Sequence, residues 1–187
     1  MVARAPYIIE VQISKLLRNS MAEILAQRQT GMDIIILKYL LTTLYQQGLL
    51  MTGIYLQLYT VLARLGHANL NMRCIEIGGG TGGATRITMR AFRANNGIKS
   101  YLDYTFTDIP PEFLATAREA LSTSRLGDMK FNMLNVEEDP ISDGYEPVYD
   151  VVIVCQVLLA TSNMHNILIN IGKLLKPGER LVLVETT

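Results

Sequence analysis

The spacing of hydrophobic residues changes about a third of the way along this 187-residue chain. In the first third, apolar residues return every three or four positions, which is the period of one face of a helix. Beyond it, short apolar runs alternate with helix-like stretches, and this alternation predicts a parallel sheet with right-handed crossovers. We therefore predict a helical N-terminal lid or cap over residues 1–65 and an α/β core over residues 66–187, which together form one compact domain.

The first region is expected to contain three helices, over residues 8–29, 33–47 and 53–65. One part of it, Tyr39–Ala63, has no charged residue and is long enough to cross a bilayer. Its glutamines, threonines and glycines would make its transfer into lipid unfavourable. The pattern therefore predicts two packed amphipathic helices here and no contact with a membrane.

The second region is expected to contain five strands that alternate with helices. The strands are predicted at 73–77, 101–107, 129–134, 148–154 and 180–184, and the helices at 83–94, 110–121 and 164–175. In such a sheet, ligands bind beyond the carboxyl ends of the strands, at the point where the strand order reverses. The polar residues that should converge there are Glu76, Asp108, Asn135, Gln156 and Glu185.

The composition of the chain limits the kinds of partner that it is expected to bind. Seventeen basic residues balance seventeen acidic ones, so no overall field attracts the chain to nucleic acid or to an anionic membrane surface. The start of the chain lacks a signal-type apolar core, and the only cysteines, Cys74 and Cys155, lie in predicted core strands. Two reduced core thiols are typical of a cytosolic protein, so we expect a cytoplasmic location. Neither cysteine has a suitably spaced partner, so no metal site is expected.

A glycine-rich stretch, Gly78–Gly83, follows the first predicted strand. Glycine tolerates positive φ and lets a ligand approach the backbone, and the N–H groups at the next helix start can bind a polar group. The stretch satisfies the Gly-x-Gly-x-x-Gly fingerprint, so an NAD(P)-dependent oxidoreductase is one alternative. Glu76 argues against this alternative, because a carboxylate repels a pyrophosphate and attracts a cationic amine. Asp108, at the end of the second strand, suits ribose hydroxyls in either case.

Three motifs together carry a family resemblance: Glu-Ile-Gly-Gly-Gly-Thr-Gly-Gly-Ala-Thr (76–85), Tyr-Thr-Phe-Thr-Asp-Ile (104–109) and Leu-Leu-Lys-Pro-Gly-Glu-Arg-Leu-Val-Leu-Val-Glu (174–185). As a set they resemble class I S-adenosylmethionine methyltransferases and, more narrowly, the C-methyltransferase domain of fungal highly reducing polyketide synthases. The resemblance covers roughly residues 50–187. It implies a Rossmann-like sheet of which strands one to five are present and the last two are missing from this chain.

The resemblance also implies S-adenosylmethionine as the cofactor. The residues implied to bind it are Glu76, Gly78, Gly79, Gly80, Asp108, Asn135 and Gln156. Glu76 and the glycines would hold the methionine part and Asp108 the ribose. Asn135 would face the adenine amino group, where the family usually has aspartate, and asparagine keeps an acceptor oxygen without the charge. Gln156 would hydrogen-bond the cofactor or the substrate, whereas Tyr104 is expected to pack against the sheet.

The reaction implied by the resemblance is methylation of the α-carbon of a β-ketoacyl chain on an acyl carrier protein, alongside other synthase domains. In the family, a histidine paired with a glutamate removes the α-proton. Glu185 matches that glutamate, but Leu159 stands in place of the histidine and cannot accept a proton. His165 and water-mediated action of Glu185 are two candidate substitutes. The main alternative to an active enzyme is therefore a pseudo-methyltransferase with a structural role.

Overall fold

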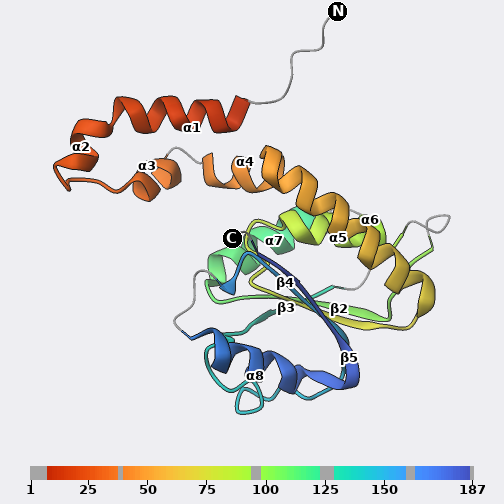
Figure 1. Cartoon of the computed structure of the whole chain (residues 1–187). Helices are drawn as coiled ribbons and strands as arrows, with labels where there is room; N and C mark the ends of the chain where they lie inside the picture. Colours follow the sequence, from red (N-terminus) through yellow and green to blue (C-terminus); the bar gives the residue numbers. More distant parts are fainter. Residues whose placement is uncertain (1–7, 38–39, 94–97, 123–128, 159–162, 186–187) are drawn as a thin grey trace, which may run out of the picture. The chain divides into compact units, whose positions relative to one another are not determined.

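The computed structural model describes residues 8–37, 40–93, 98–122, 129–158 and 163–185 (Figure 1). The chain packs as two compact units, Met1–Leu56 and Gln57–Thr187, and the boundary falls inside the long helix α5 (Leu49–Ala68). The boundary predicted from the sequence, after residue 65, falls inside the same helix. The lid role of the first region stays a prediction.

The N-terminal unit consists of short helices. They are α1 (Ile8–Asn19), α2 (Met21–Leu25), α3 (Gly31–Leu37), α4 (Leu40–Gln47) and the first turns of α5. The prediction of a single helix over 8–29 is therefore wrong, because this segment holds both α1 and α2. The predicted helix over 33–47 includes residues 38–39, which lie outside the described residues, and the described parts on either side of them are helical. Helix α3 begins at Gly31 because Thr30 and Asp33 cap each other: the Thr30 hydroxyl donates to the Asp33 carboxylate and accepts from the Asp33 N–H. None of the described helices is both long and apolar enough to cross a membrane.

The C-terminal unit contains the predicted α/β core. Its strands are β1 (Arg73–Ile77), β2 (Asp103–Asp108), β3 (Met129–Met133), β4 (Tyr149–Cys155) and β5 (Leu175–Val184). All are parallel, in the order β3-β2-β1-β4-β5. Helices α6 (Gly83–Ala91) and α7 (Pro111–Ser122) lie on one face and α8 (Met164–Leu174) on the other (Figure 1). The predicted Rossmann-like sheet of five parallel strands is confirmed.

Strand β5 differs most from its prediction. It begins directly after α8, and its register on β4 shifts between Tyr149 and Val151. The Lys-Pro-Gly segment at 176–178, which precedes the predicted strand, forms an irregularity within β5, with Gly178 at a φ of 81°. Lys176 in this segment pairs with the buried carboxylate of Asp150 at 2.6 Å. Among the described strands β5 pairs only with β4, so it lies at an edge of the sheet.

The core of this unit lies on both faces of the sheet. Toward α8, the buried hydrophobic residues include Ile75, Ile77, Val152, Val154, Ile167, Ile171 and Leu174. Side chains alternate along a strand, so Glu76, Tyr104 and Phe106 point to the other face, and all three are buried. A carboxylate therefore lies inside an otherwise largely apolar layer.

Candidate cofactor site

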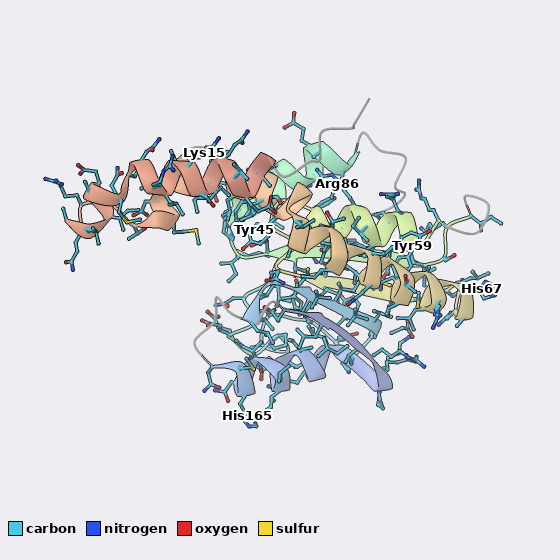
Figure 2. The ribbon with its side chains drawn as sticks, turned by 45° about the horizontal axis from the view of Figure 1, so that its top comes forward. Lys15, Tyr45, Tyr59, His67, Arg86 and His165 are labelled. Atoms are coloured by element: carbon cyan, nitrogen blue, oxygen red, sulfur yellow. The ribbon has the colours of Figure 1, made fainter. Side chains whose placement is uncertain are left out.

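The glycine stretch lies where the strand order reverses. It follows β1, which has β2 on one side and β4 on the other, and it leads into α6. Arg86 of α6, labelled in Figure 2, reaches back to this loop. Its Nη1 donates to the carbonyls of Thr81 at 2.9 Å and Gly82 at 3.0 Å. The helix therefore braces the loop from which it starts.

Three consecutive glycines are required for different reasons. A Cβ on Gly79 would lie 2.2 Å from the Phe106 ring, and one on Gly78 would lie 2.6 Å from a methyl group of Val157. These two glycines make room for the protein's own side chains. Gly80 has a φ of 52°, and the nearest atom beyond its chain neighbours is 3.9 Å from its Cβ position. Gly80 is therefore the part of the loop that a ligand can approach.

Asp108, at the carboxyl end of β2, is tied to the same loop. Its Oδ2 accepts the Gly80 N–H at 2.6 Å and its Oδ1 accepts the Ile109 N–H at 2.8 Å. The side chain is almost buried, with 8% of the residue exposed. The structure therefore brings Asp108 and the glycine loop together, while ribose binding by Asp108 stays a prediction.

Glu76 is held by two hydroxyl groups. Its Oε2 accepts from Tyr104 at 2.6 Å and from Thr85 at 2.7 Å, whereas Oε1 is buried and has no hydrogen-bond partner among the described residues. Burial raises the pKa of Glu76 to about 7, although the hydrogen bonds from Tyr104 and Thr85 act in the opposite direction. The sequence predicted only a packing role for Tyr104. The register of β1 and β2, which the structure supplies, places its side chain on the same face of the sheet as Glu76, where its hydroxyl reaches this carboxylate.

Protein stability is expected to fall between about pH 5 and about pH 7.5, and Glu76→Gln should remove part of this fall. The folded state keeps the Glu76 proton up to a pKa of about 7, against an ordinary value of 4.5. The folded state therefore binds more protons over this range, so its free energy of unfolding decreases as the pH rises. The shift corresponds to about 3 kcal/mol at most. Urea unfolding of both proteins at the two pH values measures the difference, and parallel pH profiles would contradict the expectation.

Asn135 follows β3 and is half-buried. Its Nδ2 donates to Glu138 Oε1 at 2.9 Å, and its Oδ1 accepts the Glu137 N–H at 3.1 Å. Asn170 of α8 donates to the carbonyls of Val136 and Glu138, so this turn is held against the helix. The Asn135 amide is used within its own turn, and its contact with adenine stays a prediction.

Gln156 and Glu185 directly follow the neighbouring strands β4 and β5, and the Gln156 N–H donates to the Val184 carbonyl at 2.8 Å. Gln156 has a φ of 58°, which is a left-handed conformation. Non-glycine residues seldom adopt this conformation, and those that do are concentrated at functional sites. Oε1 of Glu185 accepts the N–H groups of Val157 at 2.8 Å and Leu158 at 2.9 Å. Its Oε2 is buried without a hydrogen-bond partner among the described residues. Glu185 therefore anchors the loop whose Val157 packs against the first glycine.

The structure does not bring His165 to Glu185. His165 is exposed on the first turn of α8, with its ring on the side of the helix away from the sheet (Figure 2). Within the described part of the chain, no hydrogen bond or ion pair joins these two residues. Leu159 lies outside the described residues. A role for His165 as a base therefore stays a prediction that no contact supports.

A groove of about 600 Å³ lies away from this site. It is formed by β2, β3 and the segment before β4, and its lining includes Thr105, Lys130, Asn132 and Tyr145. None of the residues predicted to bind the cofactor lines it. The groove is therefore separate from the glycine loop.

Comparison with known proteins identifies the class to which this fold and site belong. Residues 75–181 match the family model described as a methyltransferase domain, and the chain belongs to this family. The structure of the trans-methyltransferase CalH in complex with SAH aligns with a TM-score of 0.78 and 26% identity, over 92% of this chain and 47% of that one. The CMeT domain of the citrinin polyketide synthase shows the same fold, with a TM-score of 0.80 at 22% identity, over 94% and 47% of the two chains.

Within this family, the chain is a C-methyltransferase domain of the type found in fungal highly reducing polyketide synthases. It is 57% identical over 187 residues to the polyketide synthase-like protein Preu9 of Preussia isomera and 48% identical over 185 residues to prosolanapyrone synthase of Alternaria solani. The matches cover 100% and 99% of this chain but only 9% and 7% of those proteins. The chain thus spans less than a tenth of the synthases it matches. The family favours a methyltransferase over the NAD(P)-dependent oxidoreductase that the glycine fingerprint also allowed.

Proposed function

We propose that this chain binds S-adenosylmethionine at the glycine loop and, as part of a polyketide synthase, methylates the α-carbon of a β-ketoacyl chain on an acyl carrier protein. One observation supports the cofactor part: the open backbone at Gly80 lies beside the strand that holds Glu76, whose buried Oε1 has no hydrogen-bond partner in the part of the chain that the structure describes. An open glycine admits a close ligand. A buried carboxylate oxygen without a partner suits a cationic ammonium group. The residues therefore fit the cofactor.

Different residues would bind the different parts of the cofactor. Glu76 and the glycine loop would receive the methionine part, Asp108 the ribose and Asn135 the adenine amino group. Asp108 already accepts the Gly80 N–H, so ribose hydroxyls would use the remaining lone pairs of its carboxylate. When bound, S-adenosylmethionine supplies a methyl group on a sulfonium. The acyl substrate must lose its α-proton to a base, so that its enolate carbon bonds to the methyl carbon as the methyl–sulfur bond breaks.

A pseudo-methyltransferase with a structural role is the second candidate, and two observations favour it. Leu159 stands where the base is expected, and leucine has no group that accepts a proton. Glu185, expected to orient that base, accepts two backbone N–H groups and holds the loop after β4. The two candidates share the cofactor site and differ in turnover.

Binding of S-adenosylmethionine to the 187-residue chain, measured by calorimetry, tests the cofactor part. Gly80→Ala is expected to weaken binding about tenfold or more, because a methyl group then fills the open space beside the loop. Gly144→Ala is the matched control, since Gly144 has a φ of 84° and nothing within 4 Å of its Cβ position. Absence of binding to the wild type, or an equal loss in both variants, would sink the proposal.

A further inference from the structure

Two hydroxyl groups converge on the same oxygen of Glu76. Tyr104 of β2 and Thr85 of α6 donate to Oε2 at 2.6 Å and 2.7 Å, and both donors are fully buried. A carboxylate oxygen has about two lone-pair sites, so these donors saturate Oε2. Oε1 is left buried and without a hydrogen-bond partner among the described residues. The two oxygens of one carboxylate are therefore used differently.

Two titratable groups that interact with Glu76 through their charge lie at the ends of the neighbouring strands, in the cofactor site. Asp108, at the end of β2, acts on Glu76 through its charge. The pKa of the Cys155 thiol, at the end of β4, is raised to about 12 by burial and then by the charges of Glu76 and Glu185. The titratable groups facing Glu76 are thus Tyr104 and Asp108 of β2 and Cys155 of β4, while α6 contributes the uncharged Thr85. None of these groups is a cation that could neutralise the carboxylate.

We propose that Tyr104 and Thr85 are positioning residues: by donating to one oxygen of Glu76, they favour the ionised carboxylate and leave its second oxygen to receive the ammonium group of the cofactor. Hydrogen bonds to the charged form offset the desolvation that burial imposes on it. Without them, Glu76 would take up a proton more readily and lose its attraction for a cation. The inference rests on the proposed function, because it requires the cofactor to bind at this loop.

The test is the pH dependence of binding by the 187-residue chain, measured by calorimetry from about pH 6 to about pH 8.5. The probe is S-adenosylhomocysteine, which keeps the ammonium group and lacks the sulfonium. Tyr104→Phe keeps the ring, which packs edge-on against Tyr101, and removes one donor. Loss of a hydrogen bond to a charged acceptor should raise the pKa of Glu76 by about one unit. Affinity should then be about fivefold lower than that of the wild type at pH 7 and nearly equal to it at about pH 8.5.

Two further variants keep the test decisive. Thr85→Val removes the other donor and should give the same pH-dependent loss, also if Tyr104→Phe fails to fold. Tyr149→Phe is the matched control, because Tyr149 is a buried tyrosine of β4 in the core on the α8 side, and its profile should follow the wild type. A loss by Tyr104→Phe that is the same at every pH, or no loss, overturns the inference alone. A wild type that binds no S-adenosylhomocysteine at any pH overturns the proposed function as well.

Discussion

Leu159→His is expected to raise methyl transfer to a β-ketoacyl carrier-protein substrate by roughly 10²–10⁴-fold, the usual contribution of a positioned general base. The family resemblance places the base at this position. Oε2 of Glu185 is buried and has no hydrogen-bond partner among the described residues, so it offers an acceptor for the N–H of a neutral imidazole whose other nitrogen takes the proton. Transfer of a labelled methyl group from S-adenosylmethionine measures the rate in wild type and variant.

Two controls separate a new base from a merely altered loop. Leu159→Asn introduces a polar side chain without a basic nitrogen and should leave the rate unchanged. Combining Leu159→His with Glu185→Gln should cancel most of the gain, because an amide does not support the imidazolium that forms. Its carbonyl oxygen still accepts the N–H groups of Val157 and Leu158, so the loop stays anchored. Equal rates in the wild type and Leu159→His would show that Leu159 does not limit turnover and would favour the structural role.

Gly79→Ala is expected to destabilise the methyltransferase core by about 3 kcal/mol, at the upper end of overpacking effects. The added Cβ would lie 2.2 Å from Cε2 of Phe106, a ring with no exposed surface that packs against Phe131. The loop cannot easily retreat, because the Gly79 N–H donates to the Thr107 carbonyl at 2.9 Å. The melting temperature, followed by circular dichroism, should fall by about 10 °C.

Gly80→Ala provides the comparison, since its added methyl group meets open space and only the backbone conformation is unfavourable. Its destabilisation should be about 1–2 kcal/mol, the usual range for an alanine in the left-handed region. The neighbouring glycines should therefore separate two properties, stability at Gly79 and cofactor binding at Gly80. Equal melting temperatures of the two variants would show that the Phe106 ring can move aside.

Local sequence patterns predicted the bounds of the strand β1 more accurately than those of the N-terminal helices. The apolar run 73–77 became β1 without a change of bounds, because a buried parallel strand is marked by a short hydrophobic run with polar ends. Helical periodicity continued through Ser20, where the structure has a break between α1 and α2. Helix α3 likewise starts through the Thr30–Asp33 cap. Helix ends depend on a few hydrogen bonds that periodicity does not reveal.

By itself, the sequence determined the order of strands and helices, the glycine loop after β1 and the polar residues at the strand ends. These features depend on near neighbours in the chain and on the convergence of parallel strand ends at one edge. Only the tertiary structure decided which glycine stays open and which donors hold Glu76, because its partners lie 9 and 28 positions away, on α6 and β2. It also decided that Glu185 holds the backbone of the loop after β4, a contact across 27 and 28 positions. These contacts are set by the packing of helices and strands against one another, which a local sequence pattern does not specify.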